Sequence, residues 1–137
     1  MLKAGQSTKS IPITVSRAAV RDYCDAVWEE NPMYRNIQAA KEAGYPDLPL
    51  PATYPALFWQ KVEVPWLQNV GPLVQTSQTF TYHEPLLANR TYSCSIVLDQ
   101  VRAFGKKQLL FHTLYVKKED CLIATSETTL MIEKHHP

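Results

Sequence analysis

Three side chains in this sequence could move a proton during a reaction. Glu29 lies five positions before Tyr34, and His83 stands far from both along the chain. A carboxylate and a second acid or base within reach of one water molecule are what general acid–base chemistry requires. A phenol titrates at about pH 10, so Tyr34 is better suited to donating a hydrogen bond than to shuttling protons at neutral pH. The pattern indicates acid–base chemistry with one weak member.

Each of these residues also has a structural interpretation. Glu29 falls near the end of a predicted helix, where the helix dipole disfavours a negative charge, and Glu30 beside it would take its role in a shifted register. The amide of Asn31 is suited to bracing the turn before Pro32. His83 lies on the polar face of a predicted strand, where a surface histidine is the default. Catalysis by any of them therefore depends on geometry that the sequence does not give.

Other common chemistries lack their motifs. Cys24, Cys94 and Cys121 are far apart with no CxxC spacing, so they predict free, mostly buried thiols. The four glycines form no GxGxxG or phosphate loop, and there is no HExxH. The pair His135–His136 is interpreted as a solvated tail. We predict no metal site and no cofactor.

Length and charge set the remaining bounds. The chain has 137 residues with 14 basic and 13 acidic side chains, a net charge of 14 − 13 = +1. This predicts one domain over 1–137, with 1–10 and 134–137 as tails. No basic excess favours nucleic acid, and no apolar run is long enough to cross a membrane. Reduced cysteines without a signal-peptide pattern predict a cytoplasmic protein.

The first seventy residues predict three helices. Ser16 is a suitable N-cap, and apolar residues then recur on one face. These residues are Val20, Tyr23, Cys24 and Val27. A short helix is expected from Asn36 to Gly44, and a third after Thr53 with Pro55 in its first turn. Residues 56–59 are apolar nearly all round, so this third helix must be buried.

The second half predicts strands. Residues 74–82 and 91–99 alternate between apolar and polar, which is typical of half-buried antiparallel strands. Residues 108–116 and 121–132 are apolar on both faces and predict inner strands. His112 lies in the first of these, where a hydrogen-bonded core histidine is expected. Short loops predict a four-stranded meander, and the whole predicts an α+β fold with a curled sheet around one buried helix.

Four segments in order resemble one family, the MaoC-like dehydratases or hydratase 2 proteins, over residues 10–133. Residues 23–34 resemble its helix-and-loop motif, which ends Asp-x-Asn-Pro-aliphatic-His. Residues 39–46 resemble the segment after it, and Leu48–Tyr54 resembles the loop before the central helix. Phe80–Leu86 resembles the family's F-x-Y-x-x-P-L strand end. The match is strongest to the N-terminal type of MaoC domain.

The resemblance implies a hotdog fold and reversible hydration of 2-enoyl thioesters of coenzyme A or acyl carrier protein. It implies that Asn31 and the loop before the central helix line the substrate site, through Pro51, Ala52, Thr53 and Tyr54. Glu29 stands where the family has its catalytic Asp, and Tyr34 where it has His. Domains of this type tend to complete the acyl site while a partner hotdog domain supplies the Asp–His pair.

Three functions therefore stay open. The first is a weakly catalytic or non-catalytic subunit that binds acyl thioesters and pairs with a second hotdog chain. The second is a self-sufficient homodimeric hydratase that uses Glu29 with Tyr34 or His83. The third is a thioester-binding protein without chemistry, or a thioesterase, because a fold does not fix its reaction.

Overall fold

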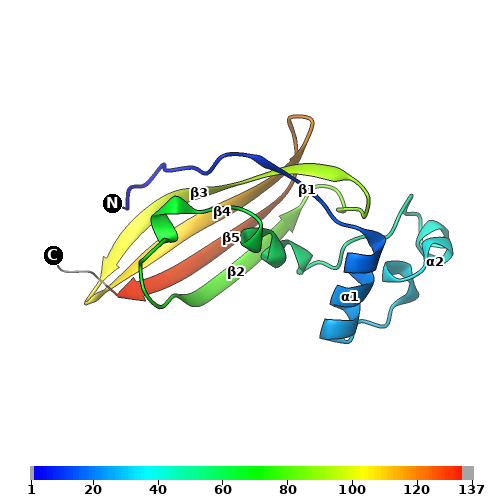
Figure 1. The fold of residues 1–137 in the computed structure, drawn as a ribbon, viewed down its shortest axis with the longest axis horizontal. Helices are drawn as coiled ribbons and strands as arrows, with labels where there is room; N and C mark the ends of the chain where they lie inside the picture. The colour runs from blue at the N-terminus through cyan, green and yellow to red at the C-terminus, as the bar shows by residue number, and fades with distance from the viewer. Residues whose placement is uncertain (1, 134–137) are drawn as a thin grey trace.

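The computed structural model describes residues 2–133 and has a five-stranded antiparallel sheet with its helices gathered on one face and at one end (Figure 1). The paired residues His135–His136 lie outside the described residues. The strands are β1 (Ile11–Thr14), β2 (Val74–Tyr82), β3 (Thr91–Phe104), β4 (Lys107–Lys118) and β5 (Cys121–Glu133). The helices are α1 (Arg17–Val27) and α2 (Ile37–Glu42), with 3-10 turns η1 (Pro32–Tyr34), η2 (Tyr54–Gln60) and η3 (Pro65–Leu67). This confirms the α+β class and the curled sheet.

The two α-helices begin where their capping residues predict. The Ser16 hydroxyl accepts a hydrogen bond from the Ala19 N–H, and the Asn36 side chain accepts from the N–H groups of Gln38 and Ala39. Both caps satisfy donors that a helix leaves unpaired in its first turn. The first helix stops earlier than Asn31–Pro32, because Trp28 adopts a left-handed conformation with φ 60°.

The predicted central helix is a seven-residue 3-10 segment, η2, instead of an α-helix. Pro55 lies in its first turn as expected, and Phe58 is almost fully buried. The aromatic side chains here pack onto the sheet face that carries the even-numbered residues of β3 and β4, such as Ile96 and Leu114. The prediction of a buried apolar segment is confirmed, although its helical type is different.

Strand order departs from the predicted meander. The order is β1-β3-β4-β5-β2, so β3, β4 and β5 are consecutive hairpins while β2 pairs with β5 at the far edge. The loop 83–90 therefore crosses the end of the sheet. It is fixed there by pairing with the loop 48–50, a contact that hairpin rules based on loop length do not include.

The missed strand is β1, which pairs with the beginning of β3. It has four residues and contains Pro12, so it carries little alternation to detect. Residues 5–8 were expected to belong to a tail, yet they continue along β3. The Thr8 N–H donates to the Ile96 carbonyl at 2.9 Å, and the Leu98 N–H donates to the Gln6 carbonyl at 2.8 Å. No helix within residues 2–133 has the length and apolarity to cross a bilayer.

Candidate functional site

A pocket of about 300 Å³ opens at the end of the sheet next to η1 and α2. Four separate segments contribute its polar and aromatic lining. The residues that matter are Tyr34, Tyr45, Ala52, Tyr82, His83 and Glu84, and we call this the Tyr34 pocket. Pro49, Leu50 and Leu86 add apolar walls. The combination of apolar walls with a few polar groups is typical of a small-molecule site.

Main-chain pairing between two loops builds one wall of this pocket. The Leu50 N–H donates to the Leu86 carbonyl, and the Ala88 N–H donates to the Leu48 carbonyl, each at 2.8 Å. The Tyr82 hydroxyl donates to the Ala52 carbonyl. These bonds hold the loop before η2 against the end of β2, so the pocket is largely formed without a ligand.

An ion pair between the partly exposed Arg17 and the buried Asp47 attaches the beginning of α1 to the same loop. The Arg17 guanidinium donates from Nε to Asp47 Oδ1 at 2.9 Å and from Nη2 to Oδ2 at 3.1 Å. Asp47 Oδ1 also accepts from the Leu48 N–H at 2.7 Å. The hydrogen bond from Arg17 is the main reason that the pKa of Asp47 lies below its usual value. This bidentate geometry positions α1, and through it the loop with Glu29, over the pocket wall.

Glu29 and Tyr34 lie on either side of a tight turn. The Asn31 side-chain oxygen accepts from the Met33 N–H at 3.1 Å, which confirms its predicted bracing role. The Glu29 carbonyl accepts from Arg35 Nε at 2.9 Å, and its carboxylate is half-buried. Tyr34 lines the pocket, whereas Glu29 is not among the lining residues. Glu29 is nevertheless near enough to act electrostatically on the Tyr34 phenol.

The phenols of Tyr34 and Tyr82 in this pocket are held in their neutral form. Burial raises the pKa of Tyr34, and the negative charge of Glu29 raises it further. Burial likewise raises the pKa of Tyr82 to about 12. Both groups can donate hydrogen bonds, but neither gives up its proton near pH 7. His83 also lines the pocket, where its side chain is exposed.

Only part of the predicted substrate loop lines the pocket, and the rest of the loop supports it. Ala52 lines the pocket, while Pro51 and Tyr54 are buried behind it. The Thr53 hydroxyl lies 2.6 Å from the Tyr23 hydroxyl and so ties the loop to α1. Of the predicted residues, the structure thus brings Tyr34, Ala52 and His83 together in one pocket. The catalytic and substrate-binding roles predicted for these three residues stay predictions, as do those of the other predicted site residues, Glu29, Asn31, Pro51, Thr53 and Tyr54.

Two lining tyrosines were missed by sequence reasoning. Tyr82 lay in a predicted strand on its inward face, so the alternation contained a signal for its burial. Tyr45 lay in a proline-rich loop and carried no such signal. Both reach the pocket because separate loops are paired, and the sequence pattern did not reveal that pairing.

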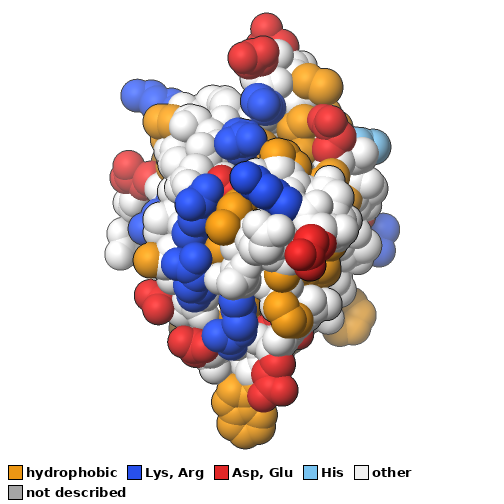
Figure 2. Space-filling view, turned by 90° about the vertical axis from the view of Figure 1, so that its right-hand side faces the viewer, with side chains coloured by type: hydrophobic (Ala, Val, Ile, Leu, Met, Phe, Trp, Pro, Cys, Tyr) orange, Lys and Arg blue, Asp and Glu red, His pale blue; other side chains and the backbone are white. Residues whose placement is uncertain are grey.

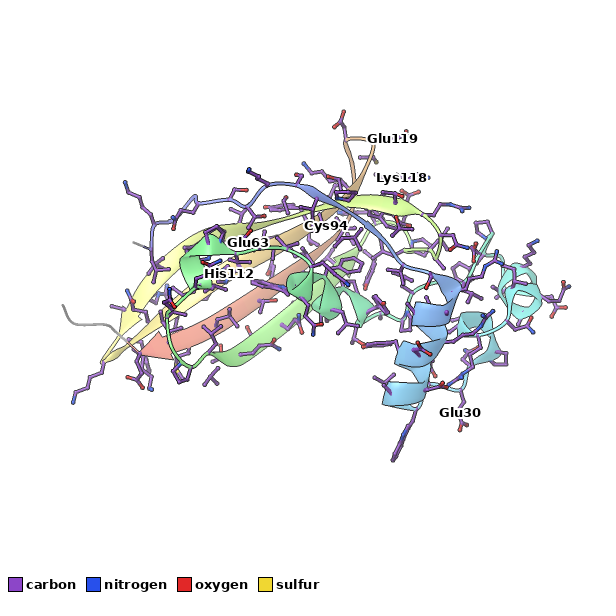
Figure 3. All side chains as sticks on the ribbon, in the orientation of Figure 1. Glu30, Glu63, Cys94, His112, Lys118 and Glu119 are labelled. Atoms are coloured by element: carbon purple, nitrogen blue, oxygen red, sulfur yellow. The ribbon has the colours of Figure 1, made fainter. Side chains whose placement is uncertain are left out.

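A second set of polar aromatic side chains joins η2 and η3 to the buried His112 of β4, away from the Tyr34 pocket (Figure 3). Trp66 Nε1 donates to His112 Nε2 at 2.9 Å, and the Trp59 ring meets the His112 ring edge-on at 5.1 Å between centroids. We call these three residues the His112 cluster. Burial lowers the pKa of His112, although Asp99 acts in the opposite direction. The expected core histidine with a hydrogen bond is confirmed.

The strand order and the buried helical segment define a hotdog fold of the MaoC dehydratase type, and comparisons agree. A family model described as the FAS1-like dehydratase domain region matches residues 3–125. Since this covers most of the chain, the chain belongs to that family. A UPF0336 protein of Thermobifida fusca is 29% identical over 133 residues, covering 92% of this chain and 88% of that protein.

Solved structures are similar to this fold at lower identity. The C-terminally truncated HadBC (3R-hydroxyacyl-ACP dehydratase) complex of Mycobacterium tuberculosis contains a chain with TM-score 0.85 and 24% identity, covering 96% of this chain and 98% of that one. A chain of the ChsH1–ChsH2 complex of the same organism has TM-score 0.74 and 19% identity, covering 93% and 89%. An (R)-hydratase of A. caviae has TM-score 0.73 and 13% identity, covering 94% and 96%. These likenesses establish the shared fold.

Proposed function

We propose that this chain is an acyl-thioester-binding subunit of a hydratase or dehydratase, and that a second hotdog chain supplies the catalytic base and acid. The observation that carries the proposal is Tyr34. It lines the pocket where the family motif has its histidine, and its pKa is raised. A group that holds its proton near pH 7 cannot alternate between acid and base during water addition.

The pocket suits a binding role. Pro49, Leu50 and Leu86 provide apolar surface for an acyl group, and the Tyr34 phenol can donate a hydrogen bond to a carbonyl oxygen. The bond from Tyr82 to the Ala52 carbonyl keeps the loop in place. These residues position a thioester, while removal and return of the proton fall to the partner.

The edge strand β2 supports pairing with another hotdog chain. It has nine residues without a charge or a proline, and most of its side chains are exposed. It pairs with β5 on one side only. Natural sheets blunt such edges with charges, prolines, bulges or short strands, and β2 has only a register shift between Gln75 and Ser77, so its long uncharged edge supports an interface. HadBC and ChsH1–ChsH2, which share the fold, are named as complexes.

The three free thiols, two of them buried, support our placement of this subunit in the cytoplasm.

The test mixes the purified chain with 2-butenoyl-coenzyme A and follows the absorbance of the conjugated thioester together with any thiol released. We expect binding without turnover. The double variant Glu29→Asp with Tyr34→His should then acquire measurable hydration, because it restores the family's base and acid in the existing pocket. Tyr34→Phe serves as the control, since it changes the same position without adding a titrating group.

A steady loss of absorbance with the unaltered chain, without thiol release, would contradict the proposal and favour the self-sufficient hydratase. One observation favours that second candidate: the half-buried Glu29 carboxylate acts on the Tyr34 phenol. Glu29→Gln should then abolish turnover in a folded protein. Release of thiol would identify a thioesterase instead, and binding that never leads to turnover with any partner would indicate a binding protein.

A further inference from the structure

A row of basic side chains crosses the end of the molecule that carries α1 and α2. Figure 2 faces this end and shows the basic side chains as a nearly continuous stripe, with acidic groups mostly around it. We define the basic stripe as Lys118, Arg90, Arg17, Arg21 and Arg35. The net charge of the chain is only +1, so the stripe reflects a local concentration of positive charge rather than an excess over the whole chain.

A shared hollow, a shared carboxylate and one hydrogen bond connect neighbouring members of the stripe. Lys118 and Arg90 line one small hollow together with Tyr92. Arg90 and Arg17 both act on the Asp47 carboxylate. Arg21 lies one helical turn after Arg17, and its Nε donates to the Arg35 carbonyl at 2.7 Å. The stripe therefore runs from the β4–β5 hairpin, over the loop before β3, and down α1.

Part of this charge is not neutralised within residues 2–133. Arg17 pairs with Asp47, and Arg35 pairs with Asp25 at 2.7 Å. Arg21, Arg90 and Lys118 form no ion pair in the described chain, although Glu84 lines the same hollow as Arg90 and Lys118. Three cations are thus available to an external anionic partner.

The basic stripe adjoins the Tyr34 pocket. Glu84 and Pro85 line both that pocket and the hollow of Arg90 and Lys118, so a single loop separates the two. A partner seated on the stripe would lie beside the pocket entrance, where a flexible arm could reach the phenols.

The α1 end of the stripe adds an apolar anchor. Trp28 is 87% exposed and Val27 is 52% exposed. Trp28 directly follows the last residue of α1, the helix that carries Arg17 and Arg21. A bulky residue rarely adopts the positive φ that Trp28 has, so the chain accepts a strained conformation that holds this ring in solvent. Trp and Arg are the residue types enriched in protein–protein hot spots, and α1 carries two arginines and ends at this exposed Trp.

We propose that the basic stripe docks an acidic carrier protein, which presents its acyl thioester to the Tyr34 pocket. This inference rests on the proposed thioester-binding function and names the carrier. A coenzyme concentrates its phosphates at one end and needs a compact cationic site. The stripe instead spreads its cations over four separate segments and ends near an exposed tryptophan, which matches the charged, partly apolar face of a protein helix.

The test compares two probes for the full chain, a bacterial acyl carrier protein loaded with a 2-butenoyl group and 2-butenoyl-coenzyme A. Dissociation constants are measured by calorimetry for the unaltered chain, for Arg90→Gln with Lys118→Gln, and for Trp28→Ala. The matched control is Lys9→Gln with Lys106→Gln, which removes the same charge from exposed positions outside the stripe. Circular dichroism checks that each variant is folded.

We expect the stripe variant and Trp28→Ala each to bind the loaded carrier protein about tenfold more weakly, with changes below about twofold for the coenzyme thioester and for the control. Carrier affinity should also fall steeply with salt. Equal weakening for both probes would overturn the proposal in favour of a phosphate site. Unchanged carrier affinity would overturn it while leaving the thioester function intact. Failure of the unaltered chain to bind either probe would refute the proposed function itself.

Discussion

The Tyr34 pocket and the His112 cluster both place polar aromatic side chains near the η2 segment, yet they differ in what can reach them. The pocket is open, and its Tyr34 and Tyr82 phenols have raised pKa values. The cluster is buried, and its histidine has a lowered pKa and accepts a hydrogen bond from Trp66. The imidazole most protected from ligands therefore has a structural role, while the accessible phenols hold their protons. This division agrees with a chain that binds a thioester and does not itself transfer protons.

The largest effect should come from removing the buried imidazole. His112→Ala opens a cavity and leaves the Trp66 N–H without its acceptor, so we expect a loss of about 2–4 kcal/mol in the free energy of unfolding. Urea denaturation followed by circular dichroism measures it. The matched control is His83→Ala, which removes an exposed imidazole and should change stability by less than about 0.5 kcal/mol. Equal losses in the free energy of unfolding at the two positions would contradict the distinction between the His112 cluster and the Tyr34 pocket.

The second prediction concerns pH. Because burial lowers the pKa of His112 below its ordinary value of 6.5, the unfolded chain binds a proton more readily than the folded one. The stabilisation is complete above pH 6.5 and is lost as the pH falls through the pKa of the folded state, with a limiting slope of about 1.4 kcal/mol per pH unit. His112→Gln should flatten this part of the stability curve, measured by urea titrations between pH 7 and 5. Parallel curves for the two proteins would show that another group governs the loss.

A smaller effect is expected in the pocket wall. Tyr82→Phe removes the hydrogen bond to the Ala52 carbonyl, which water can partly replace because Ala52 is exposed. We expect a loss of about 0.5–1 kcal/mol and faster amide exchange in residues 50–54, measured by hydrogen exchange. Tyr115→Phe is the matched control, since its hydroxyl makes no side-chain hydrogen bond within residues 2–133. Unchanged exchange in Tyr82→Phe would mean that main-chain pairing alone fixes the loop.

Local signals predicted much of the fold. The caps at Ser16 and Asn36 and the strand β2 were correct because each depends on residues close in sequence, although the alternation in burial is seen only in the second half of β2. Strand order was wrong, because β2 meets β5 through a loop that is held by distant main-chain bonds. The helical type of η2 was also wrong, since its burial was readable from apolar residues while its hydrogen-bond pattern was not.

The site was predictable in part for the same reason. Tyr34, Ala52 and His83 were named through motifs, and all three line the pocket. The Arg17–Asp47 ion pair joins residues thirty positions apart, and neither side chain carries a local sign of its partner. The basic stripe was not predicted, because its cations come from four separated segments whose proximity depends on the tertiary fold.

The uncharged β2 edge also affects how much of the newly synthesised chain is lost to aggregation and proteolysis. Along its outer side, alternate residues of the nine-residue β2 present main-chain groups that no strand within residues 2–133 pairs with, and these are a template for strand addition, whichever protein offers the strand. A chain made in excess over whatever covers this edge would lose material to aggregation and proteolysis. Its cellular abundance would then follow that of its partner, so co-production of the two should increase the yield of this chain more than slower synthesis of this chain alone.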